Sequence, residues 1–166
     1  MKKLLLLDAD VIIDLHTLRL FNKMAKAYQI KVTRTVLGEV RYFPRGDKKI
    51  KINIEYQVEV IDDVSIESIR MATLEAKEAM LIVDPGETES IGYLIEDKED
   101  IALCVLDKAA IKLMSYMDVE GKAISLETAL RNAGHHTKLY PRHLESNFKK
   151  CVEDGKALRI QYKKLY

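Results

Sequence analysis

The chain has few cysteines, no long apolar run and almost no net charge, and each shortage excludes a class of protein. Two cysteines, Cys104 and Cys151, are too few for a disulfide framework and lack the paired spacing of a zinc site. No stretch is long enough to span a bilayer, and the leucine run at 4–7 is too short for a signal peptide. The formal net charge is +1, so overall charge gives no indication of nucleic-acid binding. We therefore expect a cytoplasmic protein that makes no membrane contact.

The length and composition are those of a globular domain. The chain has 166 residues, of which 48% are hydrophobic and 32% charged, enough for one domain with a full-sized core. No internal repeat or linker is visible, so we expect a single domain over residues 1–166. Its tail, residues 141–166, has helical spacing and a basic face. We expect this tail to pack back on the domain; the alternative is a dimer face.

The most informative stretch is the opening one. Residues 4–7 are four consecutive leucines, a pattern typical of a strand buried on both faces of a parallel sheet. Asp8 and Asp10 follow at once. Ligands bind outside the carboxyl ends of such strands, so Asp8 is placed to bind a cation there. Alternatively, Asp8 is only the N-cap of the next helix.

Strand and helix patterns alternate along the rest of the chain. This predicts an α/β fold, a three-layer α/β/α sandwich with a central parallel sheet. Residues 44–47 predict a turn, and residues 48–54 a half-exposed strand that either pairs with 58–61 as a hairpin or stays outside the sheet. The other expected strands are 30–33, 101–106 and 123–126, and the expected helices are 11–27 (broken near 21–22), 34–43, 65–82, 87–97, 109–117 and 126–134.

Carboxylates from four distant segments converge on one edge of this predicted sheet. Asp8 and Asp107 each follow a buried strand, Glu39 lies on a helix, and Glu87 and Glu89 open another helix. Packed like charges repel, and a bound divalent cation removes that cost. Oxygen ligands suit Mg²⁺ or Mn²⁺, and two such ions about 3.5–4 Å apart activate water for phosphoryl displacement.

Each acidic residue also has a plainer explanation. Glu39 fits a solvated helix position, and the helix dipole alone accounts for one of Glu87 and Glu89. Asp10 and Asp14 suit capping or solvated positions, and an aspartate before proline, as at 84–85, is typical of a turn.

A basic stretch follows Glu39. Arg41, Arg45 and Lys48 lie beside Tyr42 and Phe43, a combination that can bind phosphates and stack on bases. The alternative is a solvated strand edge protected by lysines.

Four motifs in this order resemble the PIN-domain nucleases. They are LLLLDADVII (4–13), VLGEV (36–40), GETESIGYL (86–94) and LCVLDKA (103–109). The resemblance implies a Rossmann-like sandwich, Mg²⁺ or Mn²⁺, and hydrolysis of RNA phosphodiester bonds. It also implies two partners seen in many members: an antitoxin protein, in toxin–antitoxin pairs, and a second copy in a homodimer.

The resemblance assigns roles to five acids. Asp8 and Asp107 would be metal ligands, Glu39 a ligand or a residue that positions water, Glu89 the third acid of the family, and Glu87 its partner on the metal. Asp10 departs from the family, in which a small hydroxyl or amide residue is common at this position. The stretch 44–63 and the long tail from Pro141 are also less typical.

Two other functions compete with the nuclease. Asp8-Ala-Asp10-Val also resembles the first motif of haloacid-dehalogenase-type phosphohydrolases, in which Asp8 would be the nucleophile and Thr33 or Thr35 would supply the next required hydroxyl. That family also needs a late acidic pair, and Asp107 stands alone. The other alternative is a PIN-like binding module without catalysis. A nucleotide-cofactor site is not indicated, because no glycine-rich loop follows the first strand.

Overall fold

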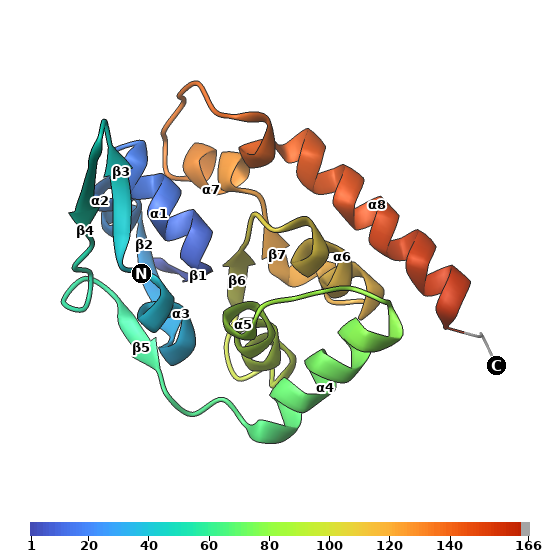
Figure 1. Cartoon of the computed structure of the whole chain (residues 1–166). Coiled ribbons are helices and arrows are strands. Elements are labelled where there is room, and N and C mark those ends of the chain that lie inside the picture. The colour runs from blue at the N-terminus through green and yellow to red at the C-terminus, as the bar shows by residue number, and fades with distance from the viewer. Residues whose placement is uncertain (164–166) are drawn as a thin grey trace.

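The computed structural model is a three-layer α/β/α sandwich around one parallel sheet, as predicted (Figure 1). It describes residues 1–163; residues 164–166, the end of the expected tail, lie outside the described residues. The five strands stand in the order β5–β2–β1–β6–β7, and every neighbouring pair is parallel. Their bounds are β1 Lys3–Leu7, β2 Tyr28–Thr33, β5 Glu59–Ile61, β6 Ile101–Cys104 and β7 Ala123–Ile124.

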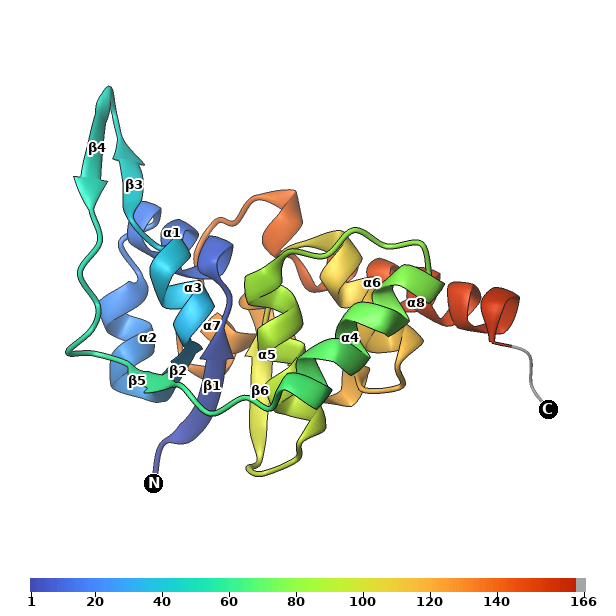
Figure 2. The same ribbon diagram turned by 60° about the horizontal axis from the view of Figure 1, so that its bottom comes forward.

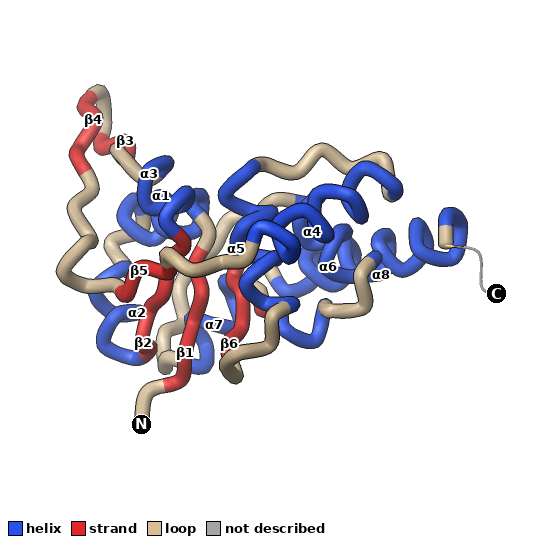
Figure 3. Tube along the Cα trace, turned by 90° about the horizontal axis from the view of Figure 1, so that it is seen from below, coloured by secondary structure: helices blue, strands red, loops and turns tan. Residues whose placement is uncertain are grey.

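The leucine run forms the central strand because both of its faces are covered. Leu5 and Leu7 belong to one apolar cluster, and Leu6 belongs to the other. The first cluster is completed by α1 (Ala9–Thr17), α2 (Phe21–Ala27), α3 (Arg34–Glu39) and α7 (Leu126–Asn132). The second is completed by α4 (Ile66–Glu78), α5 (Pro85–Ile95), α6 (Lys108–Tyr116) and α8 (Glu145–Tyr162). Figure 3 shows α4, α6 and α8 together on one side of β1.

The region after α3 differs from the prediction. The expected helix over 34–43 ends at Glu39, just after Gly38, a poor helix former. Instead β3 (Tyr42–Arg45) and β4 (Lys48–Lys51) form a separate antiparallel hairpin. Gly46, at φ 62°, supplies the positive φ that a tight hairpin turn needs. Of the two alternatives for 48–54 and 58–61, the hairpin between them is wrong. The other is confirmed, because only the second segment, as β5, joins the main sheet.

The tail packs on the domain, as expected. Helix α8 lies against α6, where Ser115 Oγ donates a hydrogen bond to the carbonyl of Val152 at 2.6 Å. A 3₁₀ turn, Pro141–His143, leads into α8, and a second one, Glu120–Lys122, precedes β7. Among the helices of residues 1–163, none has both the length and the apolar character needed to cross a bilayer.

Candidate active site at the carboxyl edge of the sheet

Asp8 lies at the carboxyl end of the central strand. Its backbone N–H extends the pairing of β1 with β6 by donating to the carbonyl of Cys104 at 3.2 Å. The residue stands at the N-cap of α1, but its side chain makes no cap hydrogen bond. The side chain is buried, with 3% of the residue exposed, and Oδ1 has no hydrogen-bond partner within residues 1–163. A buried carboxylate oxygen without a partner is costly and requires an explanation.

Other acids surround Asp8 closely enough to change its ionisation. Burial raises the pKa of Asp8 to about 7. The nearby backbone N–H groups of Ala9 and Asp10 lower it, and the charges of Asp10 and Glu39 raise it. Burial also raises the pKa of Glu87, to about 8, with the charges of Asp8 and Asp107 contributing. Asp8 and Asp107 follow the adjacent parallel strands β1 and β6 at the same edge of the sheet, and the charges of Glu39 and Glu87 act on the same residues. We call these four residues the acidic group.

Helix α5 contributes two acids with different local partners. Glu87 is buried, and its Oε2 accepts the backbone N–H of Asp84, the N-cap of α5, at 3.0 Å. The half-buried Glu89 turns toward α3, where Oε2 accepts the N–H of Thr35 at 3.0 Å. Glu89 therefore ties the start of α3 to α5, besides carrying charge near Glu39.

Glu39 lies exposed at the end of α3. Its carboxyl group is nevertheless partly desolvated, and this desolvation and the charge of Asp84 are the main causes that raise its pKa. The charges of Asp10 and Glu89 add to them, and the Gly86 backbone opposes them. Gly86 makes room for this carboxylate, since a Cβ at position 86 would lie 2.7 Å from Glu39 Oε2. Asp84, expected to be only a turn residue, is thus also a member of the acidic group.

Asp107 is half-buried at the start of α6. Its Oδ1 caps the helix by accepting the N–H of Ala110 at 3.0 Å. The capping explanation, considered for Asp8, thus holds for Asp107, which nevertheless still raises the pKa values of Glu87 and Asp10.

The side chains of the acidic group lie near one another but do not converge on a single metal position. Within residues 1–163, no three acidic, histidine or cysteine side chains are arranged to ligate one ion as they stand. Glu87, Glu89 and Asp107 each accept a backbone N–H instead. The donor set fits a hard cation in chemistry, because it consists of carboxylates that repel one another and includes the partnerless Oδ1 of Asp8. Shared ligation requires these side chains to change rotamer.

A second group of side chains, which was not expected from the sequence, lies beside the first. Asp14, expected to be capping or solvated, is buried and binds two residues of the segment before α8. Its Oδ1 accepts Arg142 Nη2 and its Oδ2 accepts His143 Nε2, both at 2.6 Å. These residues lie 128 and 129 positions from Asp14, so no local pattern could have found them.

The candidate substrate-binding residues are all exposed on or beside the hairpin. Arg45 and Lys48 face each other across its turn, and Arg41 precedes β3. Arg45 and Lys48 form no ion pair with any carboxylate of the described chain. In Figure 2 the hairpin projects upward, the direction in which β1 runs. The hairpin that carries Arg45 and Lys48 therefore projects on the same side of the sheet as the acidic group.

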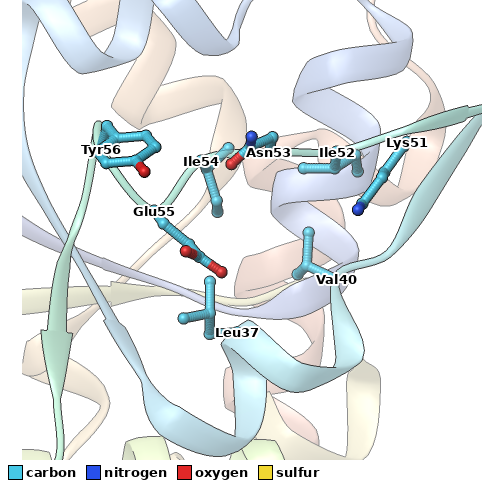
Figure 4. Close-up of a pocket in the computed structure, with 8 residues that line it drawn as sticks. All are labelled: Leu37, Val40, Lys51, Ile52, Asn53, Ile54, Glu55 and Tyr56. Atoms are coloured by element: carbon cyan, nitrogen blue, oxygen red, sulfur yellow. The ribbon is translucent and has the colours of Figure 1, made fainter.

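A pocket of about 240 Å³ lies elsewhere, between α3 and the chain after β4 (Figure 4). Leu37 and Val40 lie on one side of it, opposite Ile52 and Ile54. Its one acidic lining residue is Glu55, so it offers no group of carboxylates. This pocket is therefore not part of the acidic group at the carboxyl edge of the sheet.

Comparison with protein-family models, with curated proteins and with solved structures gave no match for this chain.

Proposed function

We propose that this protein is a ribonuclease of the PIN type that depends on Mg²⁺ or Mn²⁺ and hydrolyses RNA phosphodiester bonds. The observation that carries the proposal is Asp8, a buried carboxylate at the end of the central strand. One of its oxygens has no hydrogen-bond partner in the described part of the chain, and the charges of Asp10, Glu39 and Glu87 lie near it. A divalent cation is the partner that such an oxygen lacks.

The acidic residues at this edge of the sheet have different roles in the proposed site. Asp8, Glu39, Glu87 and Asp107 would hold the ion, which when bound supplies an activated water and neutralises charge on the phosphate. Glu89 holds Thr35 and thereby fixes α3, the helix that carries Glu39. Arg41, Arg45 and Lys48 would attract the RNA backbone from the hairpin.

The phosphohydrolase alternative has less support. Thr33 is fully buried, and its hydroxyl accepts the N–H of Val36 at the start of α3. It is therefore occupied as a helix cap rather than available to a phosphate. Asp62 and Asp63 form an acidic pair that lies too early in the chain for this family, and they are paired with Arg34 and Lys98. An antitoxin partner and a homodimer, both implied by the family resemblance, stay predictions.

The test is Mn²⁺-dependent cleavage of a single-stranded RNA, together with calorimetric titration of Mn²⁺. We expect Asp8→Asn, Glu39→Gln and Asp107→Asn each to lower the cleavage rate more than about 100-fold, since loss of even an outer-shell partner costs about 10–100-fold. Asp8→Asn should also weaken Mn²⁺ binding while the protein stays folded.

Asp100→Asn is the matched control. Asp100 is exposed and precedes β6 at its amino end, whereas Asp107 follows the same strand at the opposite edge. The control should cleave like the wild type. Wild-type rates in purified Asp8→Asn, or an absence of Mn²⁺ binding to the wild type, would refute the proposal.

A further inference from the structure

A second pocket adjoins the acidic edge. It has a volume of about 400 Å³, within the range of sites that hold small ligands. Helix α1 forms one wall and the segment leading into α8 forms another, with β3 at the side. The residues that matter here are Asp10, Asp14, Pro44, Tyr140, Arg142 and His143.

Arg142 is positioned in this pocket by an ion pair with the buried Asp14. Asp14 accepts one of its N–H groups at 2.6 Å, while 56% of the arginine side chain stays exposed. Guanidinium has five N–H donors in a planar fork, so others stay free for a ligand. Asp14 is itself fixed by His143, whose ring is buried.

The His143 ring has a defined tautomer. Its Nδ1 accepts the backbone N–H of Tyr140 at 3.2 Å, so Nε2 carries the proton that is donated to Asp14. Both ring nitrogens are therefore used within the protein. His143 positions Asp14, and through it Arg142, rather than meeting a ligand.

Arg142 lies beside the acidic group. It shares the pocket with Asp10, whose carboxylate carries the opposite charge. Asp10 is two residues from Asp8. An anchored cation next to a carboxylate centre is placed to contact a phosphate that approaches the centre.

Tyr140 offers a flat surface at the same pocket. The residue is 60% exposed, and its ring meets the edge of His143 at a centroid distance of 5.6 Å. An exposed aromatic ring supported by a buried neighbour is the platform on which unpaired bases stack. Bases within a duplex are not available for such stacking.

We propose that Tyr140 and Arg142 bind single-stranded RNA beside the acidic centre, with Arg142 contacting a phosphate and Tyr140 stacking on a base. This inference rests on the proposed nuclease function and adds two residues of the tail segment that bind the substrate. The inference also assigns an RNA-binding role to the tail, because Arg142 lies in the 3₁₀ turn before α8.

The test is fluorescence anisotropy with a labelled, unstructured 12-nucleotide RNA. Every protein carries Asp8→Asn, so that cleavage does not interfere. Arg142→Ala should weaken binding about 10-fold or more and reduce the salt slope by about 0.7, the contribution of one phosphate. Tyr140→Leu should weaken binding about 5-fold or more, and should leave binding of the same RNA annealed to its complement unchanged.

Matched controls lie at the far end of α8. Arg159 pairs with Asp118 as Arg142 pairs with Asp14, and Tyr162 is likewise an exposed tyrosine. Arg159→Ala and Tyr162→Leu should bind the RNA within 2-fold of the parent. If Arg142→Ala melts early, Arg142→Gln removes the charge while keeping a hydrogen-bond donor for Asp14.

The outcomes separate this inference from the nuclease proposal. Mn²⁺-dependent cleavage by the wild type, with Arg142 and Tyr140 variants that bind RNA like their controls, would overturn the inference alone. A wild type that neither cleaves nor binds the RNA would overturn both.

Discussion

Asp8 occupies the N-cap position of α1, yet its carboxylate does not cap the helix. Asp107 occupies the same position on α6 and does cap it. The two aspartates look alike in the sequence, each following a buried apolar run, and only the structure distinguishes them. An oxygen that is buried and not used for capping destabilises the fold, which is understandable if it serves a ligand.

The raised pKa values predict how stability depends on pH. Asp8 and Glu87 have pKa values of about 7 and about 8 in the folded protein, above their ordinary values of 3.8 and 4.5. Between these limits the unfolded chain binds fewer protons, so the free energy of unfolding falls as pH rises from about 4 to about 8. For Asp8 the loss is on the order of 2–4 kcal/mol. Denaturant titrations in EDTA at several pH values measure this fall in the free energy of unfolding.

Asp8→Asn removes one of the two titrating groups. In EDTA the variant should show a shallower pH dependence and, at pH 8, a higher free energy of unfolding than the wild type. Saturating Mn²⁺ should flatten the wild-type profile. An identical profile for the wild type and Asp8→Asn would contradict the burial and charge crowding assigned to this residue; Asp100→Asn should follow the wild type.

At the scale of elements, the continuous apolar runs predicted the two central strands, and the expected strand 30–33 lies within β2. The leucine run and the 101–106 run formed adjacent central strands, β1 and β6, because only a parallel sheet buries both faces of so apolar a segment. Lys31, in β2, is buried and paired with Glu59 and Glu99, and no local pattern predicts these partners because they come from distant segments.

The hairpin was missed for a different reason. Its turn was recognised, but the residues before the turn continued a helical spacing past Gly38, the poor helix former at which α3 nears its end. Strand β3 packs against α1, a contact that no local pattern announces.

The contact of α8 with α6 is tight enough to test. At Gly155 a Cβ would lie 2.4 Å from the carbonyl oxygen of Lys112 and 2.7 Å from Ser115 Cβ, so a backbone must move. Gly155→Ala gains about 1 kcal/mol of helix propensity, but overpacking against backbone costs about 1–3 kcal/mol or more. We expect a net loss in the free energy of unfolding, measured by urea denaturation.

Gly121→Ala is the control for this prediction, because no atom lies within 4 Å of a Cβ built there. It should change stability by less than about 0.5 kcal/mol. Equal stability of the two variants would mean that α8 does not pack on α6 as described.

At the scale of the whole molecule, the acidic edge could be predicted because topology alone assembles it. Parallel strands end at one edge, so acids after β1 and β6 had to meet there, and the helices that follow bring Glu39 and Glu87. Arg142, His143 and Asp14 could not be predicted, since their meeting depends on where the tail returns. Asp84 was missed because its turn chemistry was a sufficient explanation.

The central claim is that these carboxylates form a site for a divalent cation. Anomalous diffraction from crystals soaked in Mn²⁺ tests it most directly. We predict a peak about 2.0–2.4 Å from a carboxylate oxygen of Asp8, with at least one of Glu39, Glu87 and Asp107 also bound. Saturating Mn²⁺ that gives no peak at Asp8, or peaks only at sites away from the carboxyl edge of the sheet, would contradict the claim.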